Sequence, residues 1–231
     1  PSTAAITPIQ FCEKYCQYVD EGYTDVIHVP INRSGSSTYN NAVMAQGMLR
    51  EERPEHHLNI HLLDPHTYSM VFGWYLCEMA RKLQNGAELR HVISEFETQM
   101  NKMEVILGPY SLKQMKKSGR ISAAAAVMGE LMGIRPIITL IDGKTRVESK
   151  VRGDDKVIPA MIDLCKKRTE GVEDFDYMIG HTSIPQAAEL EKACRKAFGK
   201  APLTTFNLGG VVSANTGPDT LALVYVGKPR D

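Results

Sequence analysis

The first half of the chain alternates short apolar runs with helical segments, and this alternation constrains the fold more than any other feature. Strand-like runs rich in Val, Ile and Leu lie at residues 25–30, 58–63 and 103–108. Apolar or small residues at helical spacing predict helices over residues 8–21, 39–52, 67–83, 87–102, 111–117 and 122–132. Short connections between strands and helices predict a three-layer α/β/α domain with a mainly parallel sheet.

The pattern changes after Gly133, where two strand-like runs follow each other directly. Residues 135–141 and 145–151 flank the dipeptide Asp142-Gly143, which is a strong hairpin signal. The remaining pattern predicts helices over residues 156–169 and 185–198 and strands over 176–181, 203–207 and 221–226. We therefore expect two domains: residues 1–133 with the parallel sheet, and residues 134–231 as a two-layer α/β domain with a mixed sheet.

Charge and cysteine content restrict the possible partners and the compartment. The 27 Lys and Arg residues equal the 27 Asp and Glu residues, so no net field favours nucleic acid. Five scattered cysteines without a C-x-x-C pair suit reduced thiols, and we find no signal peptide or membrane-spanning run. The sequence thus predicts a soluble, cytoplasmic protein that binds no nucleic acid and has no stable membrane insertion.

Residues 31–39 join a predicted buried strand to a predicted helix through hydroxyl side chains, amides and one guanidinium. In parallel sheets, ligands bind beyond the carboxyl ends of the strands, and a helix start stabilises an anion. Ser37 or Thr38 is also well placed to cap the helix. Two interpretations therefore stay open: an anion site, or ordinary turn and capping chemistry.

Two further polar clusters each allow two interpretations. Residues 215–220 precede the last strand, and they form either a plain loop or a segment that folds back onto the first domain. A basic cluster is either a solvated surface or a docking site for an acidic partner, and it contains Lys116, Lys117, Arg120, Lys150 and Arg152.

The sequence contains none of several motifs typical of enzymes. It has no G-x-x-x-x-G-K-[ST] loop for a nucleotide and no G-x-S-x-G elbow of a serine hydrolase. Cys12 and Cys16 are one helical turn apart, but small core residues explain them better than a half metal site does. The neighbouring histidines of residues 56–66 have no completing ligand nearby in sequence, so we predict no metal. With the enzyme motifs absent as well, we name no cofactor and no catalytic residue.

Residues 119–138 resemble the DegV family, whose members carry the segment G-R-I-S-x-A-A-x-x-x-G-x-L-L-x-I-K-P-I-L. Residues 1–8 are similar to the family's P-T-T-S-Q-P-S-P segment, and residues 31–39 to its I-S-S-G-L-S-G-T-Y segment. Further matches lie at residues 63–64, 150–153, 179–181 and 216–218, so the resemblance covers essentially the whole chain. The family's N-terminal strand and D-S-T-A-D-L segment have no counterpart here, so we expect a longer protein or a separately supplied strand.

The resemblance implies a two-domain α/β protein that binds a long-chain fatty acid between its domains. Some family members present the acyl carboxylate to a separate fatty acid kinase, so the protein would be a carrier and not an enzyme. By the resemblance, Thr3 and Ser36 hold the carboxylate, with Ser37, Arg33 and Asn215 as further candidates. Candidates for the acyl tunnel are Met70, Phe72, Met128 and Met132, and candidates for partner docking are Arg120 and Arg152.

Departures from the family pattern keep other functions open. Asn215 stands where the family has a histidine, and an amide cannot carry a proton or a charge at neutral pH. Presentation to a kinase is therefore in question, and Arg33 is a possible source of charge. The first alternative is an enzyme or kinase subunit related to dihydroxyacetone kinase that acts on a small carbonyl or phosphate compound. The second is a structural partner protein with a vestigial site.

Overall fold

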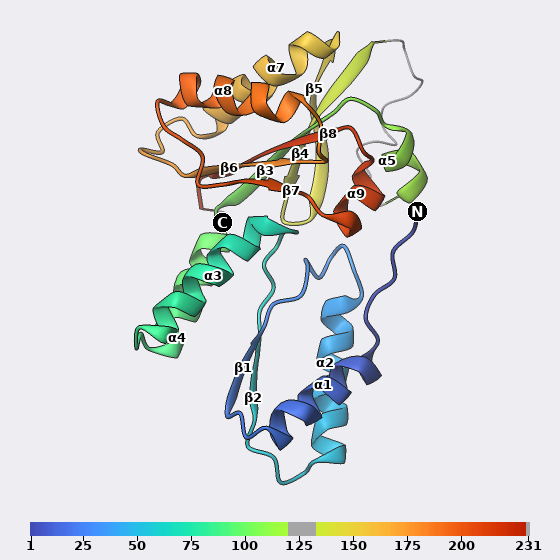
Figure 1. Ribbon diagram of the computed structural model, residues 1–231, viewed down its shortest axis with the longest axis vertical. Coiled ribbons are helices and arrows are strands. Elements are labelled where there is room, and N and C mark those ends of the chain that lie inside the picture. Colours follow the sequence, from blue (N-terminus) through green and yellow to red (C-terminus); the bar gives the residue numbers. More distant parts are fainter. Residues whose placement is uncertain (120–132, 230–231) are drawn as a thin grey trace.

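The strands of the computed structural model, which describes residues 1–119 and 133–229, form two sheets (Figure 1). The smaller sheet contains β1 (Asp25–His28) and β2 (Asn59–Leu62), which pair in parallel. Helices α1 (Pro8–Asp20) and α2 (Thr38–Glu52) cover one face of it. Their contact buries small and apolar residues of both helices: Phe11, Cys12, Tyr15, Cys16, Ala42, Ala45 and Leu49.

The start of α1 follows the sequence signal closely. The Thr7 side chain accepts a hydrogen bond from the Gln10 backbone amide, the Gln10 side chain accepts one from the Thr7 amide, and Pro8 occupies the first helical position. Two amides that the first helical turn leaves unpaired are thereby satisfied.

Among the described residues, the larger sheet has six strands in the order β5-β4-β3-β8-β6-β7. Of these strands, β6 and β7 pair in parallel and the other neighbours pair antiparallel, so the sheet is mixed, as predicted for the second domain. Its strands are β3 (Met103–Pro109), β4 (Ile134–Ile141), β5 (Lys144–Arg152), β6 (Tyr177–His181), β7 (Thr205–Asn207) and β8 (Thr220–Val226).

The assignment of strand 103–108 to the parallel sheet is wrong. This strand, β3, pairs antiparallel with both β4 and β8 in the larger sheet. All seven residues of β3 are buried, and a strand covered on both faces carries no alternation that reveals the direction of its neighbours. The predicted boundary at residues 133/134 therefore separates β3 from its partner β4. In the structure, the last strand of the smaller sheet ends at Leu62 and the first strand of the larger sheet begins at Met103.

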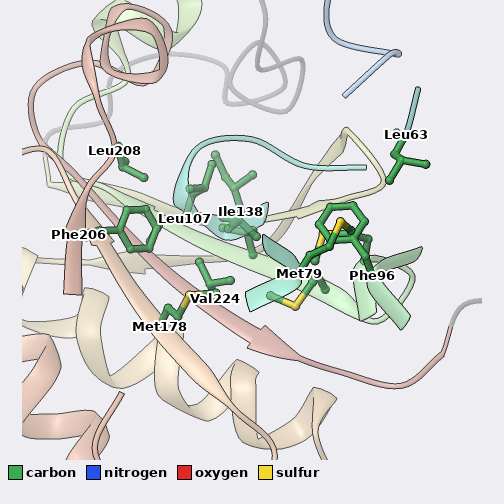
Figure 2. Close-up of a cluster of buried hydrophobic side chains, with 14 of the residues drawn as sticks. Leu63, Met79, Phe96, Leu107, Ile138, Met178, Phe206, Leu208 and Val224 are labelled. Atoms are coloured by element: carbon green, nitrogen blue, oxygen red, sulfur yellow. The ribbon is translucent and has the colours of Figure 1, made fainter. Parts of the chain in front are cut away.

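Helices cover both faces of the larger sheet (Figure 1). On one face, α7 (Val157–Arg168) and α8 (Gln186–Phe198) pack against residues such as Ile106, Leu223 and Tyr225. On the other face, α3 (Met70–Gln84) and α4 (Leu89–Met100) pack against a second cluster, shown in Figure 2, that includes Leu107, Ile138 and Val224. Successive strand residues thus enter different cores, as the two-residue period of a strand requires.

Two short helices lie beside the larger sheet and contact each other. They are α5 (Lys113–Ser118) and α9 (Gly210–Thr216), and the Gln114 amide donates to the Ala214 carbonyl at 2.5 Å. Helix α9 is not among the helices predicted from the sequence. A 3-10 turn, η1 (Asp154–Lys156), precedes α7, and the helix predicted over residues 122–132 lies outside the described residues.

The predicted hairpin is confirmed. Asp142 and Gly143, with φ of 49° and 71°, connect β4 to β5. Positive φ at both central residues is characteristic of the two-residue turns that match strand twist.

We expect Gly108→Ala to destabilise the protein by about 1–3 kcal/mol, because it overpacks the contact between β3 and α7. A Cβ at this position would lie 2.4 Å from Met161 Sδ and 2.8 Å from Val157 Cγ1. Urea denaturation measures the change, with Gly47→Ala as the control, because that added methyl meets no atom within 4 Å apart from its own stretch of helix backbone and its chain neighbours. An unchanged free energy of unfolding in Gly108→Ala would contradict the close packing described here.

Candidate functional site

Two loops that follow the parallel strands lie side by side. The first, residues 31–37, is called the hydroxyl loop below, and the second is the β2–α3 connection, residues 63–69. The Asn32 amide donates to the Thr67 carbonyl at 3.1 Å, and the Arg33 amide donates to Asp64 Oδ1 at 3.4 Å. Both loops leave the carboxyl ends of neighbouring parallel strands, and this brings them to the same edge.

Hydrogen bonds within the hydroxyl loop orient its side chains. Ser34 donates from its amide and its hydroxyl to Asn32 Oδ1, at 2.7 and 2.6 Å. The Ser36 and Thr38 hydroxyls are 2.7 Å apart, and Ser36 Oγ also accepts from the Thr38 amide at 3.2 Å. Ser37 is the N-cap residue of α2, as one of the two predicted alternatives has it, but its side chain makes no capping hydrogen bond. The Ser36 hydroxyl instead accepts the hydrogen bond of the first helical amide, that of Thr38.

The tip of the β4–β5 hairpin closes over both loops. His66 Nδ1 lies 2.6 Å from Asp142 Oδ1. A Cβ on Gly143 would lie 2.3 Å from Ser34 Oγ and 2.6 Å from Asn32 Oδ1, so only glycine permits this close approach. The larger sheet thus forms one wall of a space whose other wall is the hydroxyl loop.

A cavity of about 1050 Å³ lies at this junction. Its polar end consists of the hydroxyl loop, the N-terminal segment from Thr3 to Ala5, Tyr68 and the end of α9. Figure 1 shows the N-terminal segment running from α1 towards α5 and α9, which explains how residues so distant in sequence share one cavity. The apolar wall contains residues on the sheet face that carries the core of Figure 2, together with residues from α3 and α9: Val71, Val105, Leu107, Leu140, Leu208, Val212 and Ala222.

All five residues predicted to hold a carboxylate line this cavity: Thr3, Arg33, Ser36, Ser37 and Asn215. Two of them are partly engaged elsewhere. Arg33 Nε lies 3.3 Å from Asp64 Oδ2, with the guanidinium side chain 64% exposed, and the Asn215 amide donates to the Val211 carbonyl at 2.8 Å. Arg33 is therefore a weaker source of charge for a ligand than its residue type suggests.

The predicted tunnel residues behave differently. Met70 and Phe72 do not line the cavity, whereas Val71 between them does. Met70 is exposed, and Phe72 packs against the core cluster on the sheet without reaching the cavity. Arg152 is exposed at the end of β5. Met128, Met132 and Arg120 lie outside the described residues.

Sequence reasoning missed Tyr68, Lys144 and most of the apolar wall. In β3, Val105 and Leu107 face the cavity side of the sheet and Ile106 faces the opposite core. With this strand assigned to the larger sheet, its alternation would have indicated Val105 and Leu107 as wall residues. Lys144 begins the strand after the hairpin turn, and the sequence carries no local signal that places it at a cavity.

One group of side chains offers possible metal ligands within the described residues. Ligand atoms of Cys12, Cys16 and Glu52 lie within 4.8 Å of one another. Burial raises the pKa of the Cys12 thiol to about 12 and also raises that of Cys16, so both thiols keep their protons at neutral pH in the metal-free protein. The packing of both thiols between α1 and α2 favours a core role.

A family model described as an uncharacterised protein of the DegV family matches residues 1–228. The chain belongs to the DegV family. The resemblance seen in residues 119–138 is thereby confirmed over nearly the whole chain. Among the described residues, we find no helix long and apolar enough to cross a membrane.

Relatives of this chain come from several bacteria. DegV domain-containing proteins of Clostridium perfringens and Staphylococcus aureus are 29% and 28% identical, over 98% and 99% of this chain and 78% of each relative. A stearic acid-binding protein of Eubacterium ventriosum superposes with a TM-score of 0.87 at 20% identity, over 98% of this chain and 78% of that one. A fatty acid binding DegV protein of Streptococcus agalactiae gives 0.83 at 25% identity, over 99% and 79%.

Proposed function

We propose that this DegV family protein binds a long-chain fatty acid, with the carboxylate at the hydroxyl loop and the acyl chain along the sheet. One observation carries the proposal: a single cavity joins a hydroxyl-rich end to a wall of buried aliphatic residues. Hydroxyl donors suit a carboxylate, and the aliphatic wall suits a methylene chain. Solved relatives described as binding stearic acid or loaded with heptadecanoic acid support the same ligand class.

The acyl chain supplies most of the binding free energy. Each buried methylene contributes roughly 0.8 kcal/mol, so about a dozen contribute on the order of 10 kcal/mol before the costs of association are subtracted. The hydroxyls then determine which end of the ligand enters the polar part of the cavity. A site with a long apolar wall and a hydroxyl-rich end favours a carrier over an enzyme that acts on a small carbonyl or phosphate compound, since such a small substrate needs no long apolar wall.

The resemblance further supports a role as a carrier that presents the carboxylate to a separate fatty acid kinase. Arg152, which is exposed, and Arg120, which lies outside the described residues, are the residues proposed to dock that kinase. Asn215 matters for phosphoryl transfer from the kinase to the carboxylate, because its side-chain amide hydrogen-bonds an oxygen but cannot transfer a proton. We therefore propose that the protein binds the fatty acid whether or not a kinase then phosphorylates the carboxylate.

Titration of the delipidated protein with palmitate tests the proposed function. We expect one molecule bound per chain, and native mass spectrometry of protein purified from bacteria should show a mass increase matching a fatty acid. A protein that is purified empty and binds neither palmitate nor oleate would overturn the proposal. Binding of a small phosphate compound in the same cavity would favour the enzyme alternative.

A further inference from the structure

Tyr68 brings a phenol hydroxyl to the polar end of the cavity. The residue belongs to the β2–α3 connection, its ring is half-buried, and it lines the cavity together with Ser36. Among the described residues, its hydroxyl has no hydrogen-bond partner. A phenol O–H is both a donor and an acceptor, so one donor of this site stands available to a ligand.

Gly35 makes the position of this hydroxyl possible. A Cβ at residue 35 would lie 1.8 Å from the Tyr68 hydroxyl oxygen and 2.9 Å from its Cζ. The phenol therefore lies directly against the backbone between Ser34 and Ser36. Because the φ of Gly35 is not positive, steric room is what this position requires.

The hydroxyls and amides around Tyr68 are already partly engaged. Ser36 shares a hydrogen bond with Thr38, and Asn215 donates to a helix carbonyl. The Arg33 guanidinium pairs with Asp64. Burial, reinforced by the Asp64 carboxylate, raises the pKa of the Tyr68 phenol, which keeps its proton in place as a donor at neutral pH.

We propose that Tyr68 donates a hydrogen bond to the ligand carboxylate and thereby makes the site prefer a free fatty acid to a neutral lipid of the same chain length. This inference rests on the proposed function. A hydrogen bond to a charged oxygen is stronger than one to an ester carbonyl, so the phenol contributes to selectivity as well as affinity. The preference comes from the charge of the head group, because both ligands bury the same chain.

Tyr68→Phe tests the proposal with two ligands, palmitate and methyl palmitate, on delipidated protein. We expect the dissociation constant for palmitate to rise about tenfold and that for methyl palmitate to change less than twofold. Equal weakening of both ligands, or no change in either, would overturn the proposal, since packing alone does not distinguish an acid from its ester. A wild-type protein that binds neither ligand would instead overturn the proposed function.

Gly35→Ala provides an independent test of the contact. In the wild-type background, the added methyl displaces the phenol, and we expect it to lower the preference for palmitate about as much as Tyr68→Phe does. In a Tyr68→Ala background the same change should have almost no effect, because the clashing atoms are gone. Gly47→Ala is the matched control, since its methyl meets no atom within 4 Å apart from its own stretch of helix backbone and its chain neighbours. Equal effects of Gly35→Ala in both backgrounds would contradict the role of the contact.

Discussion

Replacement of two cavity hydroxyls, Thr3→Val combined with Ser36→Ala, weakens palmitate binding by about a hundredfold. Both side chains line the polar end of the cavity, and each is half-buried. A hydrogen bond to a charged oxygen contributes about 1.5–3 kcal/mol. The loss of two such bonds to the carboxylate therefore weakens binding more than any single substitution at the polar end of the cavity. Isothermal titration of the delipidated variants measures the change.

The matched control is Thr205→Val combined with Ser149→Ala, which removes the same two hydroxyl types from exposed strand positions away from the cavity. We expect the control to bind palmitate like the wild type. If the Thr3 and Ser36 variant also kept wild-type affinity, the carboxylate would have to lie elsewhere in the cavity, and the assignment of both residues would fail. Circular dichroism should confirm that both double variants are folded.

Arg168→Met should destabilise the protein by about 3 kcal/mol, which is the largest stability effect that we expect from a single side chain. Arg168 forms a bidentate pair with Glu104, whose side chain is only 9% exposed, and Tyr225 donates to Glu104 Oε2 at 2.6 Å. Loss of the guanidinium leaves a nearly buried carboxylate with one neutral donor. Urea denaturation at neutral pH measures the difference.

The exposed pair of Arg195 and Glu191 serves as the control for this prediction. The side chain of Arg195 is 52% exposed, so Arg195→Met should cost about 0.5 kcal/mol or less. Adding Glu104→Gln to Arg168→Met should recover part of the lost stability, since it removes the unpaired charge. Equal effects of the two arginine substitutions would show that burial of Glu104 does not govern the energetics of its pair.

Most of the helices and strands could be predicted from local pattern, while the partners of the strands could not. Helix α1 begins at the predicted cap, and the Asp142-Gly143 turn connects β4 and β5 as expected. The β3 strand appeared where its apolar run predicts it, yet it pairs in the other sheet. Strand pairing depends on segments distant in sequence, such as β8, and a uniformly apolar run does not specify them.

The polar end of the site was predictable because its residues cluster in sequence. Residues 31–37 combine hydroxyls with the start of a helix, and this combination indicates an anion site without any tertiary information. Tyr68 was not predictable in the same way. Tyr68 contacts Gly35, which is 33 positions earlier in the chain, and no local sequence pattern predicts a contact between residues so far apart.

The sequence by itself determined most of the helices and strands, the family and the hydroxyl end of the cavity, because each depends on residues close together in the chain. Tertiary structure alone decided that Val71, Val105, Leu107 and Ala222 form one apolar wall beside those hydroxyls. It also decided that Arg33 pairs with Asp64 while the Tyr68 hydroxyl stays available. A cavity is defined by surfaces that different segments present to one another, and only the packing of the two sheets creates it.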